Sequence, residues 1–369
     1  MASLAGSPAH VARAVVRQAV GLARGEHLLV ASWSHTLPWA AAIVAEARRV
    51  GGVPTLLLED EAAFWDGLEG ARSTRAWAGP SAPVRAAVAR ADALVYFPGP
   101  ADRPRLHALP TPLLDPLLGR DDQWWRLARA AGVRGVRCLL GYASDPQAEH
   151  WGVPGAVWRS RLIRGVVAAD YAAVGRAAAR VARRLRDGRL LRLTAGNGTD
   201  LTVELRGRRP WVDDGRVDAD DRRWGRWLAT SPPGSVVVAV AEGTARGTIV
   251  ANRPSYLAGG RADGGQWEVD GGRLRNYWYT DEGASFEREF ATAPRGREVV
   301  GLFALGLNPA VAKSVPQAED LEAGTVTVAV GGNSLYGGRN RCAFLAWITV
   351  GEASVSVDGV PVCDRGTIL

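Results

Sequence analysis

Side chains suited to acid–base chemistry or charge recognition occur in the second half of the chain. Glu242 directly follows the apolar run 236–241, and a carboxylate among apolar neighbours has a raised pKa and can act as an acid or a base. A glycine-bounded loop, residues 331–342, adds an amide, a phenol and two guanidinium groups: Asn333, Tyr336, Arg339 and Arg341. Either arginine can clamp a substrate carboxylate. The candidate catalytic residues are therefore Glu242, Tyr336 and Arg339.

Structural roles compete with each of these assignments. Glu242 can equally anchor backbone amides of the turn that follows it, and the two arginines can be solvated loop charges. Cys342 has no neighbouring histidine to activate it as a nucleophile, because the last of the five histidines is His150. The three cysteines form no CxxC pair, which disfavours a disulfide framework or a cysteine zinc site. We therefore expect a cytoplasmic protein.

Tryptophan is unusually common, with 14 residues against 6 phenylalanines. Trp267, Trp278 and Trp347 all lie in the second half and can form an aromatic pocket that stacks on a planar or cationic substrate. The alternative is that the aromatic residues fill a β-domain core or a dimer interface. Both interpretations remain open from the sequence.

Composition excludes several classes of protein. Of the 45 basic residues only Lys313 is a lysine, and the arginines are dispersed and often interrupted by acids, so the net charge of +7 forms no concentrated basic face for nucleic acid. No apolar run approaches the length of a membrane span. Residues 1–20 lack the continuous apolar core of a secretory signal. Phosphate-loop and nucleophile-elbow motifs are missing.

Strand and helix patterns alternate in residues 1–187, which predicts an α/β domain with a mainly parallel sheet. The expected strands are 27–32, 53–58, 93–97 and 136–141. The expected helices are 9–23, 38–50, 82–90, 124–131 and 168–185.

Residues 188–369 are instead rich in short strands and hairpin turns such as Asp270-Gly271 and Asp358-Gly359, and predict a β-rich α+β domain. The expected strands are 190–194, 201–205, 236–241, 247–251, 267–269, 274–279, 325–330, 343–350 and 354–357. One helix is expected around residues 285–291.

Several segments, in this order and spacing, resemble the aminopeptidase T family of metallopeptidases and their ring-opening relatives, the dihydroxypyridine dioxygenases. These segments are 12–32, 175–215, 232–250, 304–311 and 324–362. The resemblance runs over nearly the whole chain. It implies an aminopeptidase T-like fold, a homodimer, and a cleft in the second domain where relatives hold a metal ion.

The residues at the metal-ligand positions depart from the family pattern. Relatives usually carry glutamates where this chain has Ser235 and Leu302, and a histidine and an acidic ligand where it has Leu345 and Trp347. Thr327 and Gly332 also replace frequent ligands. Leucine and indole offer no lone pair to a divalent ion. We therefore expect no metal and no cofactor, and a cleft whose substrate-binding residues are Ser235, Leu302, Leu345, Trp347, Asn333, Arg341, Trp278 and Trp267.

Three functions are compatible with these observations. The first is a metal-independent enzyme of specialised metabolism that performs acid–base isomerisation, cyclisation or condensation of a small apolar or aromatic intermediate. The second is an inactive pseudo-aminopeptidase that binds a ligand or a partner subunit. The third is a metal-dependent aminopeptidase or ring-cleaving dioxygenase with ligands supplied from elsewhere. The expected partner in the first case is a small-molecule substrate, with no nucleic acid or membrane.

Overall fold

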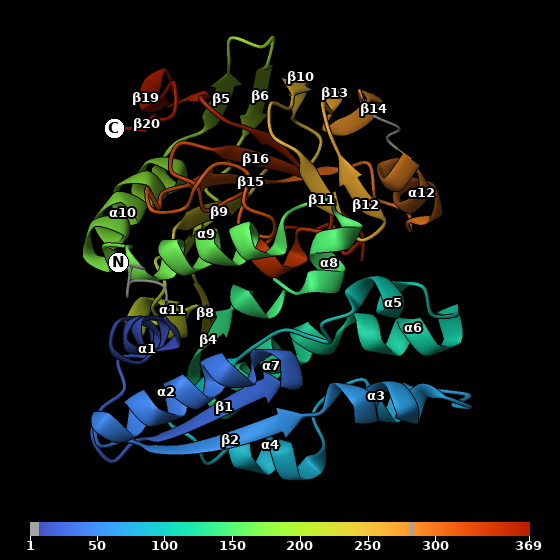
Figure 1. Cartoon of the computed structure of the whole chain (residues 1–369). Helices are drawn as coiled ribbons and strands as arrows, with labels where there is room; N and C mark the ends of the chain where they lie inside the picture. Colours follow the sequence, from blue (N-terminus) through green and yellow to red (C-terminus); the bar gives the residue numbers. More distant parts are fainter. Residues whose placement is uncertain (1–6, 281–283) are drawn as a thin grey trace. The chain divides into compact units, whose positions relative to one another are not determined.

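The computed structural model describes residues 7–280 and 284–369 and divides the chain into two compact units (Figure 1). Unit 1 comprises Met1–Ala168 and Gly215–Pro233, and unit 2 comprises Ala169–Asp214 and Gly234–Leu369. These units differ from a single division after residue 187. The helix Tyr171–Asp187 belongs to unit 2, and the chain later returns to unit 1 for one short segment.

Unit 1 contains a five-stranded parallel sheet in the order β2-β1-β3-β4-β8, as the strand–helix alternation predicts. The strands are β1 His27–Trp33, β2 Val53–Glu59, β3 Ala93–Tyr96, β4 Arg134–Cys138 and β8 Leu228–Ser231. The first four match expected strands. The edge strand β8 was not expected, because it comes from the segment that returns from unit 2.

The helices of unit 1 precede or connect these strands along the chain. They are α1 Pro8–Arg13, α2 Leu37–Arg49, α3 Glu61–Leu68, α4 Ala82–Val88, α5 Arg103–His107, α6 Thr111–Leu118, α7 Arg120–Ala131, α8 Asp145–His150, α9 Gly155–Val167 and α11 Ala219–Arg223. The expected helix 9–23 is α1 continued by a π-helix, Ala14–Val20, which ends at Gly21 with a left-handed φ of 59°. The expected helix 9–23 therefore extends three residues past the observed end at Val20, where the left-handed Gly21 closes the helix.

The core of unit 1 explains why its central strand is uniformly apolar. All four residues of β3 are buried, and Leu94 and Tyr96 pack with Val88 of α4 and Ala128 of α7. A strand covered on both faces has no solvent side, so its sequence does not alternate.

Unit 2 contains two antiparallel sheets, as its short strands predict. The eight-stranded sheet has the order β14-β13-β10-β6-β5-β18-β19-β20, and the five-stranded sheet has the order β17-β16-β15-β9-β7. The strands of the first are β5 Leu190–Thr194, β6 Asp200–Glu204, β10 Arg246–Val250, β13 Gln266–Asp270, β14 Arg273–Trp278, β18 Ser354–Val357, β19 Val360–Asp364 and β20 Thr367–Ile368. Those of the second are β7 Trp211–Asp213, β9 Ser235–Ala239, β15 Val300–Gly306, β16 Val326–Gly331 and β17 Leu345–Val350.

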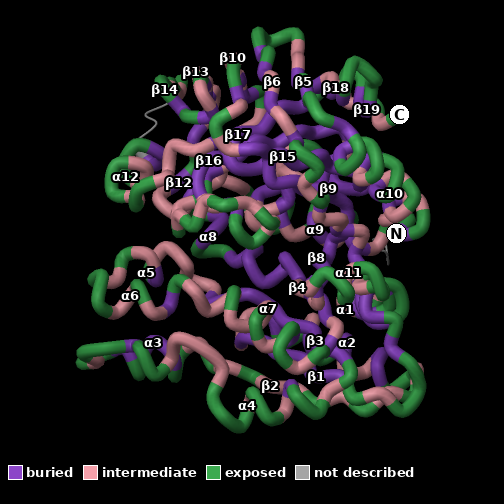
Figure 2. The backbone as a smooth tube through the Cα atoms, turned by 180° about the vertical axis from the view of Figure 1, so that it is seen from behind, coloured by how far each residue is buried: buried purple, intermediate pink, exposed green. Residues whose placement is uncertain are grey.

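Three further elements complete unit 2: α10 Tyr171–Asp187, α12 Ala284–Thr292 and the hairpin β11 Ser255–Leu257 with β12 Gly260–Ala262. The hairpin turn at Asp358-Gly359 is confirmed, with φ of 50° and 78° at its two central residues. Strand β15 was not predicted although it lies at the centre of its sheet. Its seven residues are all buried, so the period of two that marks a half-exposed strand is absent (Figure 2).

The main core of unit 2 lies between its two sheets. Leu191 and Leu193 of β5 belong to the same buried cluster as Val236 and Val238 of β9 and Phe303 of β15. Helix α10 adds Ala178, Val181 and Leu185 to this cluster. In residues 7–280 and 284–369, no helix is both long enough and apolar enough to cross a membrane.

Candidate functional site

The five-stranded sheet of unit 2 has a second face, which points away from the core between the sheets. Side chains alternate along each strand, so the residues between the core positions gather on this second face. Its centre is a small apolar cluster: Val237, Ala239, Leu302, Ala304 and Ala329. Three larger side chains pack around the cluster: Trp211, Tyr336 and Trp347. We call this surface the inner face.

Strand register places on the inner face most of the residues at which the resemblance implied metal ligands. Leu302 pairs with Ala239 on one side and Ala329 on the other, and Ala329 pairs with Trp347. In the next row Ala304 pairs with Val237 and Thr327, and Ser235 pairs with Gly306. The structure therefore brings together Ser235, Leu302, Thr327 and Trp347. Leu345 follows the same alternation but is 40% exposed at the edge strand.

The inner face offers few groups that could hold a divalent ion. Its polar side chains include the buried hydroxyls of Ser235, Thr327 and Thr349. Neutral hydroxyls are weak ligands compared with imidazole or carboxylate, and the aliphatic side chains have no lone pairs. Across residues 7–280 and 284–369, no three His, Cys, Asp or Glu side chains come together to form a metal site. The residues present on the inner face do not fit a divalent metal ion.

Thr327 is the inner-face residue with an unsatisfied polar atom. It is 1% exposed, and its Oγ1 has no hydrogen-bond partner within the described residues. A buried hydroxyl without a partner is costly, by about 1–3 kcal/mol. A bound polar molecule that reached this hydroxyl would relieve that cost.

Glu242 lies just after β9 and is surrounded by donors. Its carboxylate accepts hydrogen bonds from both Nη atoms of Arg208, from Asn333 Nδ2 at 2.8 Å and from the Arg339 backbone amide at 2.7 Å. Partial burial raises its pKa, but the hydrogen bonds from Arg208, Arg339 and Asn333 outweigh that effect and lower the pKa to about 2. The expectation of a raised pKa at Glu242 is wrong. The carboxylate anchors a backbone amide, though of a distant loop and not of the next turn.

The anchored loop joins β16 to β17 and is held by two asparagines. Asn333 is buried, and its side chain donates to Glu242 and to Gly301 O while accepting from the Asn340 backbone amide at 2.9 Å. Asn340 Nδ2 donates to Gly296 O and Gly331 O, both at 2.8 Å. All of these contacts are within the protein, so Asn333 acts as a structural link.

The remaining predicted loop residues differ in position. Arg339 and Arg341 are exposed, and Arg339 is attached to Glu242 through its backbone and not through its guanidinium group. Tyr336 is half-buried and packs edge-on against Trp211, with ring centroids 5.3 Å apart. Tyr336 is thus the loop side chain that reaches the inner face.

The predicted aromatic set is divided between two places. Trp267 is fully buried between the sheets, where its Nε1 donates to the Tyr279 hydroxyl at 3.2 Å and its ring lies 5.7 Å from Phe286. Tyr277 packs edge-on against the same Phe286, whereas Trp278 is 49% exposed. Of the three predicted tryptophans, only Trp347 lies on the inner face. Trp267 and Tyr277 are core residues because strand alternation turns them towards α12.

Two residues of interest were missed from the sequence. Trp211 lies on the short strand β7 and pairs with Val237, so it forms one wall of the inner face. Glu319 lies in the long connection between β15 and β16, where burial raises its pKa to about 8. A three-residue strand and an irregular connection have no periodic pattern, so periodicity could not indicate where Trp211 or Glu319 lies.

A glutamine in place of Glu319 is expected to flatten the pH dependence of stability. The folded carboxyl has a pKa of about 8 and the unfolded one about 4.5, so the folded state holds an extra proton between these values. Stability from this group is complete below pH 4.5 and is lost as the pH rises through about 8. The melting temperature of the native chain relative to that of Glu319→Gln should fall across this range. The exposed control Glu287→Gln should follow the native chain, and parallel curves for all three proteins would contradict the assignment.

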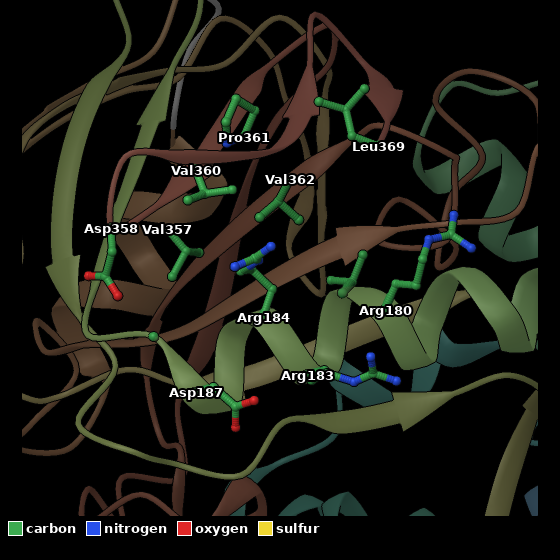
Figure 3. Close-up of a pocket in the computed structure, with 12 residues that line it drawn as sticks. Arg180, Arg183, Arg184, Asp187, Val357, Asp358, Val360, Pro361, Val362 and Leu369 are labelled. Atoms are coloured by element: carbon green, nitrogen blue, oxygen red, sulfur yellow. The ribbon is translucent and has the colours of Figure 1, made fainter.

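A separate surface pocket of about 500 Å3 lies beside α10 and the β18–β19 hairpin (Figure 3). Three arginines of α10 contribute to it: Arg180, Arg183 and Arg184. None of the predicted site residues lines this pocket. All three arginines are exposed to solvent, which screens their charges and weakens charge-based binding there.

Comparison with known structures identifies the architecture. The structure of aminopeptidase T (AmpT) from Thermus thermophilus matches with a TM-score of 0.73 and 18% identity, over 98% of each chain. This chain has an aminopeptidase T-like fold. The 2,5-dihydroxypyridine dioxygenase of Pseudomonas putida KT2440 matches with a TM-score of 0.67 and 14% identity, over 100% of this chain and 98% of the other. Identities this low establish the aminopeptidase T-like fold alone.

Sequence comparisons add no closer relative. No protein-family model matches the chain. No curated protein matches it either. The aminopeptidase T-like fold is therefore shared without a sequence match that would transfer an activity.

Proposed function

We propose that this chain is an enzyme that works without a metal ion and acts on a small apolar or aromatic molecule at the inner face. The observation that carries the proposal is the composition of that face. Ser235, Leu302, Thr327 and Trp347 share one sheet surface, and the resemblance implies metal ligands at these positions. A floor of small residues between Trp211 and Trp347 suits a planar or apolar ligand.

The proposed chemistry is isomerisation, cyclisation or condensation of an intermediate of specialised metabolism. Such reactions depend on positioning and on one or two proton transfers. Glu242 cannot supply a proton near neutral pH, because its pKa is about 2. Tyr336 and Thr327 lie on the inner face, so we assign them as the groups that hydrogen-bond the substrate there.

A second candidate function is supported by the state of Glu242. The carboxylate that the sequence singled out as a catalyst is occupied by donors from Arg208, Asn333 and the Arg339 backbone. A protein that binds the same molecule without converting it would need only the inner face. Product formation from a bound compound distinguishes the two candidates, since a binding protein returns the compound unchanged.

Metal analysis tests whether the protein works without a metal ion. The purified full-length protein is expected to contain no stoichiometric iron, cobalt, zinc or manganese. Addition of each ion should leave its melting temperature unchanged, because a ligand that binds the folded state raises stability. One tightly held ion per chain would contradict the proposal and favour a metal-dependent aminopeptidase or dioxygenase.

Substitution of Trp347 tests whether the inner face binds a small aromatic molecule. A panel of small aromatic compounds, screened by thermal shift and by product analysis, should include at least one that binds or is converted. Trp347→Ala should weaken binding of that compound by about tenfold, because a stacked ring contributes roughly 1 kcal/mol or more. Trp278→Ala, which removes an exposed tryptophan of the same unit, should leave binding unchanged. Equal effects of the two substitutions would remove the inner face as the site.

A further inference from the structure

Unit 1 contains a pocket of about 370 Å3 at one end of its parallel sheet. The pocket is lined by the last residues of β1 and β2 and by the residues that follow β3, including Trp33, Glu59 and Phe97. It therefore lies at the carboxyl ends of three adjacent strands. All of its lining residues belong to unit 1, so the inner face of unit 2 contributes nothing to it.

Strand order gives this position a topological reason. The chain passes from β1 to β2 on one side of β1 and then crosses to β3 on the other side. The connections that leave β1 and β3 therefore diverge, and they open a crevice outside the carboxyl ends of these strands. In open parallel sheets, ligands bind at such a switch point. The pocket coincides with it.

Contacts within the protein hold the aromatic wall of the pocket in place before any ligand binds. Trp33 is 6% exposed, lies edge-on to Phe64 at 5.3 Å, and has the Arg120 guanidinium 5.2 Å from its ring centroid. Its indole rests directly on the backbone of Gly99, where a Cβ atom would lie 2.4 Å from Trp33 Cδ1. No other residue type fits at Gly99 without displacing the ring.

Two further tryptophans extend the wall. Trp124 of α7 stacks on Tyr96 with centroids 5.7 Å apart and planes at 18°. Trp77 lies 6.5 Å from Phe64 and is half-buried. The pocket thus combines Trp33, Trp77 and Trp124, which suits a planar ring.

Two acids and one base line the pocket: Glu59, Asp121 and Arg120. Each acid is in an ion pair, Glu59 with Arg120 at 2.7 Å and Asp121 with Arg103 at 3.7 Å. Arg120 Nη2 donates to both carboxylate oxygens of Glu59, at 2.8 and 2.7 Å, and Asp121 accepts from the Tyr142 hydroxyl at 2.8 Å. Both carboxylates are therefore held in place, and a carboxylate has further lone pairs that can accept a hydrogen bond from a donor in the ligand.

We propose that this pocket is a second ligand site, specific for a planar aromatic molecule that carries an amine nitrogen able to donate hydrogen bonds. The ring stacks among the tryptophans, and the nitrogen donates to the carboxylates. The site does not depend on the function proposed for unit 2, because the two share no residue.

Paired probes test this site in the full-length protein. Tryptamine and indole-3-acetate have the same ring and opposite charge, so a preference for tryptamine of about tenfold or more is expected by calorimetry. In protein labelled with 5-fluorotryptophan, tryptamine should shift the 19F signals of Trp77 and Trp124, identified through Trp77→Phe and Trp124→Phe. The signal of the exposed Trp224, identified in the same way, is the control and should not move.

Asp121→Asn should reduce the preference for tryptamine, and either single tryptophan substitution should weaken its binding about three- to tenfold. Both tryptophan substitutions are conservative, and unchanged melting temperatures will show that the variants fold. Equal binding of the two probes would overturn the preference for an amine. Absence of binding, or signal changes elsewhere only, would overturn the site.

Discussion

Replacement of Glu242 by glutamine is expected to lower the free energy of unfolding by about 2–3 kcal/mol. The substitution keeps the shape of the side chain but removes the charge that Arg208 and the Arg339 amide bind. Both side chains of the Arg208–Glu242 pair are largely buried, with 16% and 21% exposure, so the arginine loses its counter-charge and keeps only neutral acceptors such as Val240 O. Denaturant unfolding measures this loss.

A matched control is available in the same unit. Glu204 also pairs with an arginine, Arg206, but their side chains are 45% and 63% exposed. Glu204→Gln should therefore cost less than about 1 kcal/mol. Equal losses for Glu204→Gln and Glu242→Gln would show that Glu242 does not anchor the loop.

Two further readouts separate this role from a general loss of stability. The exposed Arg339 and Arg341 are trypsin sites in the anchored loop, so Glu242→Gln should be cleaved there faster, before global unfolding.

The contribution of Glu242 to stability should also depend on pH, with a definite sign. With a pKa of about 2 in the folded state and 4.5 in the unfolded state, Glu242 stabilises the fold above pH 4.5 and loses this effect as the pH falls towards 2. Glu242→Gln should lack that acid-side loss.

Replacement of Trp267 by alanine is expected to have a still larger effect on stability, of about 3–5 kcal/mol. The indole is fully buried, lies 5.7 Å from Phe286 and donates to Tyr279, so its removal leaves a large cavity and abolishes that hydrogen bond. Thermal and denaturant unfolding measure the loss. Trp278→Ala on the adjacent strand should cost under about 1 kcal/mol, because Trp278 is half exposed.

Trp267→Ala also tests whether Trp267 is a core residue or part of the ligand site. Ligand binding at the inner face should persist in Trp267→Ala at temperatures where the variant remains folded. A variant with native stability that failed to bind would instead place Trp267 in the site, contrary to its position between the sheets.

Part of the fold was predictable because local patterns carried it. Alternation of apolar strands and helices predicted β1 to β4 and their parallel pairing, and Asp358-Gly359 predicted its hairpin. Strand β8 was not predictable, because its neighbour β4 lies far away in the sequence and in the other segment of unit 1. Strand β15 was missed because both of its faces are buried.

The candidate site divides in the same way. The resemblance placed Ser235, Leu302 and Trp347 at one site, and the strand register puts them on one sheet face. The lowered pKa of Glu242 could not be predicted from the sequence, because its partners Arg208 and Asn333 lie 34 residues before it and 91 residues after it. The sequence showed only its apolar neighbours, which would raise the pKa, and not the donors that lower it.

By itself, the sequence determined the alternation of strands and helices in unit 1 and the short strands of unit 2, through local propensity and periodicity. The aminopeptidase T-like fold was expected from the resemblance of several segments to that family, and the structural match supports it. Tertiary structure alone decided that Trp267 is a core residue, that Glu242 is a fixed anion and that Trp33, Trp77 and Trp124 meet at one pocket. Burial, hydrogen bonding and pKa depend on which distant residues meet, and a chain does not display those contacts until it folds.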